Sequence, residues 1–420
     1  MQYELAKKMG IKKEVVDLYN ECEEEIGEVF RRVQDISMQN TAKVMNAFWK
    51  NKLSETHFIA STGYGYDDIG RETIEKIYAE VFGAEDALVR IQFVNGTHAL
   101  STALFGNLLP SDTMLSITGA PYDTLAESIG IVENKMSLIN LGVKYEQVDL
   151  VDNSFNFKAI REKLEAQKVK LVFIGRSRGY STRKSLTISE IKEVIDFVKN
   201  IDKDVIVMVD NCYGEFVEEL EPTNVGADLI AGSLIKNIGG SLCETGGYIV
   251  GKRECVERSA ERLTAPGIGK ECGATLGKNK EILQGLFMAP HIVENAVMTA
   301  CICASMLEKL GFDVSPTAFE DRTDIIQSIT FNDKEKLIKF IQGIQASSPI
   351  DSFVRPEPWA MPGYTDEVIM AAGTFVSGAS IELSADAPIR APYMAYMQGG
   401  ITYESAVIAI CKAISDIMGK

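Results

Sequence analysis

The chain has 420 residues, 46% of them hydrophobic and 24% charged, and its 59 acidic side chains outnumber 43 basic ones for a net charge of −16. A chain of this length can bury a large core without disulfides, and its composition excludes both a disordered polymer and a multi-span membrane protein. The acidic surface repels nucleic-acid phosphates and anionic membranes, so we expect neither as a partner. A soluble protein that acts on a small molecule fits best.

The cysteines and histidines exclude the common metal and disulfide classes. The eight cysteines include no Cys-x-x-Cys pair, and three histidines cannot assemble a zinc-hydrolase site, so we expect a cytoplasmic protein without a metal. Residues 1–30 are charged throughout, lack the apolar stretch of a secretory signal and predict an amphipathic helix. The longest apolar run, residues 296–307, is too short to span a bilayer and predicts a buried core helix.

Strands and helices alternate from about residue 61 to residue 290. An amphipathic helix follows Gly70, a strand is predicted at 87–94, and the turn at residues 95–98 opens another helix. Thr187 and Glu190 form a capping box at the start of a further helix. More apolar strands are predicted at residues 114–118, 171–175, 205–210, 229–233 and 246–251. Such strands, separated by helices, indicate a mainly parallel sheet covered on both faces.

The residues after 290 predict a smaller α+β domain. A long helix at 291–310 leads into it, followed by strands at 324–331, 367–375 and 380–384 and helices at 333–345 and 403–418. The predicted fold class is therefore α/β, with an N-terminal helical arm (1–60), a large domain (61–290) and a small C-terminal domain (291–420) that includes the connecting helix.

Two sequence patterns resemble known catalytic motifs but lack essential parts. Residues 246–252 have the glycine and lysine spacing of a nucleotide P-loop, but Arg253 stands where a serine or threonine must bind magnesium. Ser233 and Lys236 match the S-x-x-K pattern of penicillin-interacting enzymes, yet the S-D-N and K-T-G motifs are missing from the chain. Neither pattern predicts its usual function here.

Asp210 and Lys236 follow two predicted neighbouring strands. Because ligands of open α/β sheets bind at the carboxyl ends of the strands, we expect these two side chains to meet there. A carboxylate at the end of a buried strand needs a cation, and a lysine in an apolar segment has a lowered pKa and a nucleophilic amine. Taken singly, Asp210 also fits a loop cap and Lys236 a salt-bridge lysine.

The wider pattern is typical of a pyridoxal 5'-phosphate site. This cofactor needs a lysine for its aldehyde and a carboxylate beside its ring nitrogen, roles that fit Lys236 and Asp210. The cofactor phosphate binds backbone amides at a helix N-terminus, which the Gly96-Thr97 turn offers together with the Thr97 hydroxyl. Ser233 could add a second hydroxyl. Gly96 and Thr97 alone also fit an ordinary turn between a strand and a helix.

Six segments make the chain similar to a known family. They are FVNGTHAL (93–100), GAPYDTL (119–125), RSRGYS (176–181), VDNCYGEF (209–216), GSLIKNIGG (232–240) and SIELSADAPIRAPY (380–393). Over nearly its whole length the chain resembles the methionine gamma-lyase-like, or aluminium-resistance, family of pyridoxal-phosphate proteins, which is related to the cystathionine beta- and gamma-lyases. The resemblance implies the aspartate-aminotransferase-like fold, fold type I, and assembly into a homodimer or homotetramer.

The resemblance also implies roles for single residues. Lys236 matches the lysine that bonds to the cofactor, and Asp210 matches the partner of its ring nitrogen. Tyr122 stands where relatives place an aromatic ring on the cofactor, and its phenol could assist proton transfer; a core or surface tyrosine is the alternative. Tyr66 and Arg71 correspond to a pair that reaches the phosphate from a neighbouring subunit. Their spacing is wider than in the cystathionine lyases, and Arg71 otherwise simply begins the next helix.

Several arginines are candidates for binding the substrate. Arg390 is our choice for the α-carboxylate, because a guanidinium group can bind both oxygens at once, while an interdomain salt bridge is the alternative. Arg178 and Arg176 are alternatives for the same task or for the phenolic oxygen of the cofactor.

The predicted activity is that of a carbon–sulfur lyase. It would cleave cystathionine, methionine or a related amino acid by β- or γ-elimination to a thiol, a 2-oxo acid and ammonia. Another amino-acid reaction of the same cofactor, transamination or aldol cleavage, is one alternative. A stress-related or regulatory protein that binds the cofactor with little turnover is another.

Overall fold

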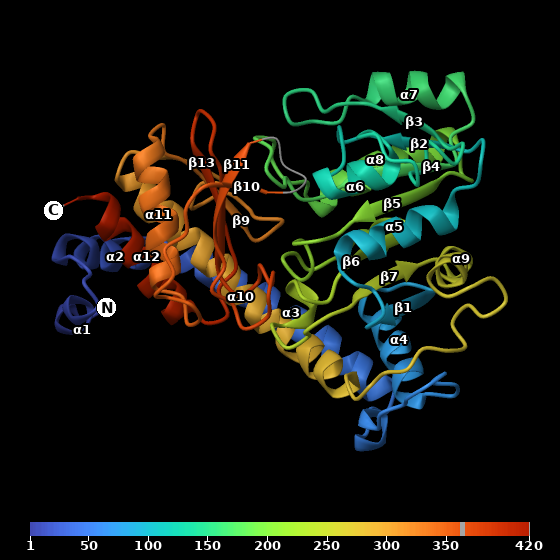
Figure 1. Cartoon of the computed structure of the whole chain (residues 1–420), viewed down its shortest axis with the longest axis horizontal. Coiled ribbons are helices and arrows are strands. Elements are labelled where there is room, and N and C mark those ends of the chain that lie inside the picture. Colours follow the sequence, from blue (N-terminus) through green and yellow to red (C-terminus); the bar gives the residue numbers. More distant parts are fainter. Residues whose placement is uncertain (362–365, 420) are drawn as a thin grey trace.

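The computed structural model describes residues 1–361 and 366–419. Figure 1 shows two sheet-containing parts joined by long helices, and both chain termini lie beside the smaller part. The N-terminal helices are α1 (Tyr3–Lys8), α2 (Lys13–Glu25) and α3 (Gly27–Lys50). The single helix predicted over residues 1–30 is therefore wrong: the chain breaks at Gly10, whose φ of 75° is left-handed, and again at Ile26.

The large sheet has seven strands in the order β1-β7-β6-β5-β4-β2-β3. The strands are β1 (Asp86–Arg90), β2 (Thr113–Ser116), β3 (Lys144–Gln147), β4 (Leu171–Gly175), β5 (Ile206–Asp210), β6 (Leu229–Ser233) and β7 (Gly247–Gly251). Neighbours from β6 to β3 pair in parallel, whereas β7 is antiparallel to β6 and β1. The connection from β6 to β7 contains only the short helix η3 (Asn237–Gly239), too little for the crossover that a parallel strand needs.

Helices cover both faces of this sheet. They are η1 (Glu55–Phe58), α4 (Ile69–Val81), α5 (Gly96–Asn107), α6 (Asp123–Ile129), α7 (Phe157–Ala166), α8 (Ile188–Ile201), η2 (Pro222–Val225) and α9 (Arg253–Leu263). Within β5, Val207 and Val209 join the core cluster that includes α8, and Met208 joins the cluster that includes α5 and α9. Successive residues of a strand point to opposite faces, so the sheet is buried on both sides, as expected from its apolar strands.

The capping box at α8 forms as the sequence predicts. The Thr187 hydroxyl accepts a hydrogen bond from the Glu190 backbone N–H (3.2 Å), and the Glu190 carboxylate accepts one from the Thr187 N–H (2.8 Å). At residues 246–252, where the P-loop pattern was rejected, the chain forms strand β7. These residues therefore belong to the sheet and not to a phosphate-binding loop.

The smaller part is an antiparallel sheet with two helices, α11 (Lys334–Ala346) and α12 (Tyr403–Ile417). Its strand order is β10-β11-β12-β13-β9-β8. The strands are β8 (Asp313–Ser315), β9 (Ile326–Thr330), β10 (Trp359–Ala360), β11 (Glu367–Ala371), β12 (Ser384–Pro388) and β13 (Met394–Gln398). The strand predicted at 380–384 is wrong, because the Glu382 carboxylate accepts backbone N–H groups of Phe375 (2.7 Å) and Val376 (3.0 Å) and holds this segment as a loop.

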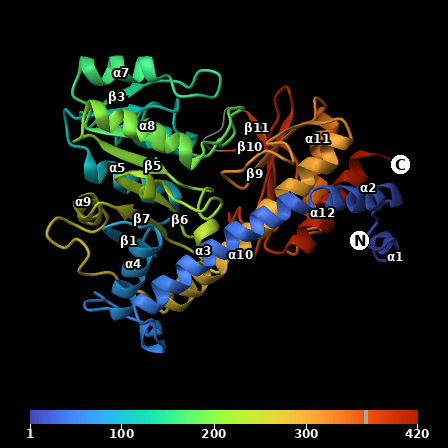
Figure 2. The same ribbon diagram turned by 180° about the vertical axis from the view of Figure 1, so that it is seen from behind.

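A 31-residue helix, α10 (Asn279–Lys309), joins the two parts. It begins earlier than predicted and passes through the expected domain boundary at residue 290. Figure 2 shows α3 lying along α10, and the Ser37 hydroxyl donates to the Pro290 carbonyl across this contact (3.2 Å). Among the described residues α10 alone is long and apolar enough to cross a membrane, but 78% of its most apolar window is buried inside the protein, as in a core helix.

Candidate functional site

The structure places Asp210 and Lys236 at one edge of the large sheet. Asp210 ends β5 and pairs in register with Ala231 of β6, and Lys236 follows in the turn after β6. The Asp210 carboxylate accepts a hydrogen bond from the Cys212 backbone N–H (3.1 Å). The Lys236 amine lies over the ring of Tyr213, 4.0 Å from its centroid. The two residues therefore lie at the carboxyl ends of adjacent parallel strands, where open α/β sheets bind ligands.

The two charges perturb each other. Burial raises the pKa of Asp210, and the positive charge of Lys236 opposes that shift. Burial disfavours the ammonium form of Lys236, but its neighbours Cys212, Tyr213 and Asp210 together outweigh burial and raise the pKa of the lysine. For the chain alone the direction of the lysine pKa is therefore opposite to the lowered pKa expected from the apolar sequence, because Cys212, Tyr213 and Asp210 together favour the ammonium form.

The N-terminus of α5 lies beside the same strand ends. Its first residue is Gly96, where an added Cβ would lie 3.2 Å from Cβ of Ser233 and 3.7 Å from Sγ of Cys212. Only glycine permits this approach without a shift of its neighbours. The Thr97 hydroxyl contacts the Thr124 hydroxyl (2.7 Å), and Ser233 is buried at the end of β6. The start of a helix, where backbone N–H groups lack helical partners, thus lies beside the ends of β5 and β6.

This arrangement fits pyridoxal phosphate. The free N–H groups at the start of α5 suit a phosphate, the Lys236 amine suits an aldehyde, and the Asp210 carboxylate suits a protonated ring nitrogen. The close approach at Gly96 places the start of α5 directly against Ser233 and Cys212. The fit depends on the chemistry of these three groups and on their placement at one edge of the sheet.

Tyr122 lies at the boundary between the two parts of the molecule. It precedes the first residue of α6 and is 43% exposed. Its ring meets the ring of Tyr180 edge to face, with centroids 6.3 Å apart, and Tyr180 in turn lies 5.3 Å from Tyr396 of β13. Tyr122 is therefore part of an aromatic wall that extends from the large sheet to the small one.

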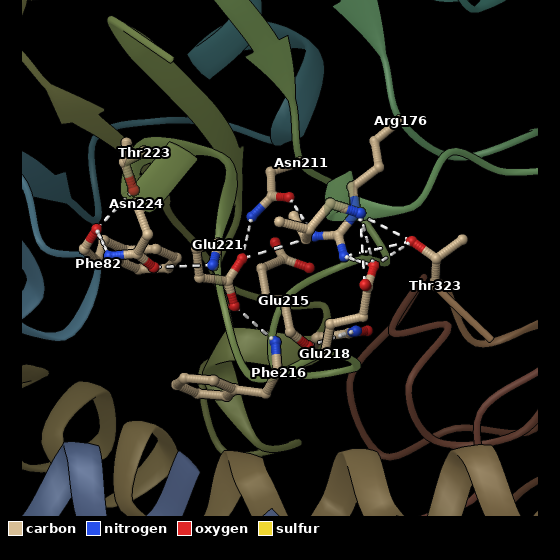
Figure 3. A network of polar contacts seen from close by, with 12 residues as sticks. Phe82, Arg176, Asn211, Glu215, Phe216, Glu218, Glu221, Thr223, Asn224 and Thr323 are labelled. Atoms are coloured by element: carbon tan, nitrogen blue, oxygen red, sulfur yellow. Dashed lines mark hydrogen bonds and ion pairs between the residues drawn. The ribbon is translucent and has the colours of Figure 1, made fainter. Parts of the chain in front are cut away.

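Arg176 and Arg178 are engaged by protein groups. The Arg178 guanidinium donates to the Ser315 carbonyl (3.1 Å) and the Ser328 hydroxyl (3.0 Å) and so ties the loop after β4 to the small sheet. Arg176 is fully buried, donates to Asn211 (2.8 Å) and pairs with Glu218 and Glu221. Figure 3 shows this network between β5 and the segment that holds Thr323. These contacts give both arginines a role in joining the domains.

Arg390 occupies a different setting. It lies in the turn between β12 and β13, is exposed and pairs with Asp366 (3.0 Å). Burial raises the pKa of Asp123, the first residue of α6, and the charge of Arg390 opposes that shift. Arg390 is therefore an exposed cation of the small domain whose charge acts on the start of α6 in the large one.

Arg71 stabilises the loop that carries Tyr66. Arg71 is buried and donates to the carbonyls of Gly65, Gly273 (2.8 Å) and Glu271 (3.2 Å). Tyr66 is exposed and stacks on Tyr64. Within one chain, Arg71 thus shapes the loop that presents Tyr66. The phosphate contact from a neighbouring subunit stays a prediction.

Three neighbours of the site were missed by sequence reasoning. Tyr213 reaches Lys236 because its backbone adopts a left-handed φ of 73°, which sequence patterns do not reveal in a tyrosine. Arg183 donates to the Gly175 carbonyl (2.7 Å); burial lowers the pKa of Arg183 to about 10, and the Asp210 charge acts against this shift. Asp386 of β12 comes from a strand placed incorrectly by the sequence. The polar segment around Arg183 was an available signal, whereas Asp386 stands between two alanines and is marked only by its own charge.

Comparison with known proteins first defines the class of fold. The chain superposes on the pyridoxal-5'-phosphate-dependent protein YhfS of Escherichia coli with a TM-score of 0.60 at 15% identity, covering 90% of this chain and 96% of that one. This likeness confirms the predicted fold class: an α/β protein with a mainly parallel sheet in a large domain and a smaller C-terminal α+β domain.

The chain belongs to the methionine gamma-lyase family, whose sequence model matches residues 15–418. The protein YnbB of Bacillus subtilis is 54% identical over 403 residues, 95% of this chain and 96% of that protein. A carbon–sulfur lyase involved in aluminium resistance from Clostridium novyi superposes with a TM-score of 0.95 at 53% identity, covering 98% of each chain. A structure from Clostridium acetobutylicum, proposed to be a cystathionine beta-lyase involved in aluminium resistance, superposes with a TM-score of 0.96 at 52% identity. The match covers 99% of this chain and 98% of that one. The predicted family and class of enzyme are confirmed.

Proposed function

We propose that this chain is a pyridoxal-phosphate-dependent carbon–sulfur lyase that acts on a sulfur-containing amino acid. The observation that carries the proposal is the placement of Lys236 and Asp210 at adjacent strand ends, beside the N-terminus of α5. Membership of the methionine gamma-lyase family and the likeness to a carbon–sulfur lyase from Clostridium novyi support it.

Each part of the cofactor has a candidate partner. Lys236 would bond to the aldehyde carbon, and Asp210 would keep the ring nitrogen protonated. The amides of Gly96 and Thr97 and the hydroxyls of Thr97 and Ser233 would hold the phosphate. Tyr122 would cover one face of the ring. When bound, the cofactor withdraws electrons from the α-carbon of an amino acid.

The residues of the chain then divide the work of elimination. The Lys236 amine, once released by the incoming amino group, removes the α-proton and can return a proton elsewhere. Arg390 would bind the α-carboxylate, because it is exposed and its charge acts on the start of α6. The partly exposed Tyr122 phenol, just before α6, would donate a proton to a departing thiolate. Elimination would release the thiol, and hydrolysis of the remaining enamine by water would then give a 2-oxo acid and ammonia.

Product identification with defined substrates tests this function. Purified protein loaded with cofactor is incubated with cystathionine, methionine, homocysteine and cysteine, and thiol and 2-oxo acid are quantified. We expect both products from at least one thioether, no activity above background for Lys236→Ala, and borohydride fixation of the cofactor on a peptide that contains Lys236. Lys192→Ala on the exposed face of α8 is the control. Full activity of Lys236→Ala, or an aldehyde or amino-acceptor product in place of thiol, contradicts the proposal.

We further propose a cytoplasmic homo-oligomer, a dimer or a tetramer. Unpaired cysteines, seven of the eight buried, suit a reducing compartment. An exposed apolar surface, which we call the tyrosine loop surface, supports self-association; it comprises Ile59, Tyr64, Tyr66, Val94 and Leu276. The Tyr64 carbonyl accepts the Gly273 N–H (2.8 Å), so two of its segments lie together. Clustered apolar side chains on a surface mark interaction sites.

A further inference from the structure

The β12 strand presents two chemically different faces. Ala385 and Ala387 belong to the main core cluster, together with Phe340 and Ile344 of α11. Because side chains alternate along a strand, Ser384 and Asp386 point to the opposite face. That face meets the large domain: Tyr396, which is opposite Asp386 in the register, donates from its hydroxyl to the Tyr180 carbonyl (2.9 Å). Asp386 thus lies between the two domains.

The Asp386 carboxylate is only half satisfied. The side chain is buried, with the residue 7% exposed, and its Oδ2 accepts hydrogen bonds from the Tyr180 hydroxyl (3.0 Å) and the Gln398 amide (3.0 Å). Among the described residues no group donates to Oδ1, and no lysine or arginine pairs with Asp386. The buried hydroxyl of Ser384, on the same face, also has no described partner. The Ser384 hydroxyl is a fully buried atom, and such an atom is costly unless a ligand completes its hydrogen bonding, whereas Asp386 Oδ1 is reached by solvent and is open to a donor.

This carboxylate belongs to the wall of the Lys236 site. Burial raises the pKa of Tyr213, whose ring lies under the Lys236 amine, and the Asp386 charge adds to that shift. Tyr180, which donates to Asp386, stands 6.3 Å from Tyr122 between ring centroids. Asp386 thus contacts Tyr180, the neighbour of Tyr122, and its charge acts on Tyr213, although it comes from the other domain.

The open oxygen is suited to a cation. Two neutral donors on Oδ2 favour the ionised carboxylate, and burial raises the pKa of Asp386 only to about 6, so the group is charged at neutral pH. An ammonium group that donates to Oδ1 would complete its hydrogen bonding and neutralise its charge. The α-amino group of the substrate cannot serve, because it must displace the Lys236 amine.

We propose that Asp386 binds a second ammonium group of the substrate, so that the enzyme prefers thioether amino acids with an amino group at both ends over those with one. The inference rests on the proposed lyase function and names its substrate class: a diamino thioether such as cystathionine, and not methionine. Asp386 acts as a specificity-determining residue, since it contacts the distal end of the substrate and not the bond that breaks.

Two ligands without a carbon–sulfur bond test this recognition apart from turnover. 2,7-Diaminosuberate is the carbon analogue of cystathionine, and 2-aminosuberate lacks only its second amino group. Calorimetric titration of the cofactor-loaded protein should show the diamino acid binding roughly 10- to 100-fold more tightly, the range of a hydrogen bond to a charged group. Asp386→Asn should reduce this preference to about 3-fold or less, and Asp196→Asn, an exposed acid on α8, should retain it.

Three outcomes separate the possibilities. Equal affinity of the two ligands for the unmodified protein overturns the inference, whether or not Asp386→Asn folds. Equal weakening of both ligands by Asp386→Asn also overturns it, since the residue would then serve the α-amino end or the domain contact. The third outcome is a protein that binds 2,7-diaminosuberate more tightly than 2-aminosuberate and yet releases no thiol from any thioether. That result supports the recognition site and contradicts only the proposed lyase function.

Discussion

Arg176 is a buried cation that neutralises two carboxylates. Its guanidinium pairs with Glu218 (3.0 Å) and with the fully buried Glu221 (3.6 Å), and Figure 3 shows Thr323 from the segment before β9 in the same network. Removing one member of such a group leaves uncompensated buried charge. This residue therefore acts mainly on stability, although the sequence presented it as a candidate for substrate binding.

Replacement of Arg176 tests this reading. We expect Arg176→Ala to lower the free energy of unfolding by about 3–5 kcal/mol, measured by urea denaturation. Arg32→Ala is the matched control, because Arg32 pairs with Asp321 on the surface and should change stability by about 0.5 kcal/mol or less. Similar small effects of both substitutions would contradict the assigned role.

Glu215 should make stability depend on pH. It is buried, its Oε1 accepts the Tyr248 hydroxyl (2.7 Å), and burial raises its pKa from 4.5 to about 8. Between these two values the folded state holds a proton that the unfolded state has lost, so stability falls as pH rises through this window. Urea titrations at several pH values should show this loss, up to about 1.4 kcal/mol per pH unit, relative to Glu215→Gln. Parallel pH curves for the two proteins would refute it.

At the scale of elements, the packing of α11 on α12 depends on Gly343. An added Cβ at this position would lie 2.6 Å from Cα and 2.9 Å from Cβ of Ala413. The helices would have to move apart, because the obstacle includes backbone. At Gly27, the first residue of α3, the same added Cβ has nothing within 4 Å.

The two glycines predict opposite effects of one substitution. Gly343→Ala should destabilise the protein by about 1–3 kcal/mol through overpacking. Gly27→Ala should be neutral or stabilise it by up to about 1 kcal/mol, since alanine restricts the unfolded chain and fits the helix. Thermal unfolding followed by circular dichroism measures both. A destabilised Gly27→Ala together with a neutral Gly343→Ala would contradict the packing described for these helices.

At the scale of the whole molecule, the tyrosine loop surface should govern assembly. We expect the unmodified protein to have the mass of a dimer or tetramer in light scattering, and Tyr64→Glu to shift it toward the monomer, because a charge would be buried at the contact. Phe353→Glu is the control: Phe353 is 87% exposed but lies in the small domain, far from this surface in sequence. A monomeric unmodified protein, or loss of assembly only in the control, would count against the proposal.

Much of the large domain was predictable because its signals are local. Apolar strands, the Thr187 capping box and the glycine turn at Gly96 each depend on residues close in sequence. Asp210 and Lys236 could be paired because both follow strands whose carboxyl ends share one sheet edge. The antiparallel direction of β7 escaped prediction, since the apolar pattern of a strand is the same in both directions.

The small domain was less predictable. Its β12 strand, Ser-Ala-Asp-Ala-Pro, contains residues with weak strand preference and exists because β11 and β13 pair on either side of it. The boundaries of α10 and of the N-terminal helices likewise depend on packing between α3 and α10.

The sequence by itself determined the class of fold, the family and the lysine and aspartate at the strand ends, because periodicity and short motifs encode them locally. Tertiary structure alone decided which charged groups face the site. It engaged Arg176 and Arg178 in domain contacts, left Arg390 exposed with its charge acting on the start of α6, and brought Asp386 against Tyr180 of the large domain. Such assignments depend on which distant segments become neighbours, and burial then sets the cost of every charge that remains unpaired.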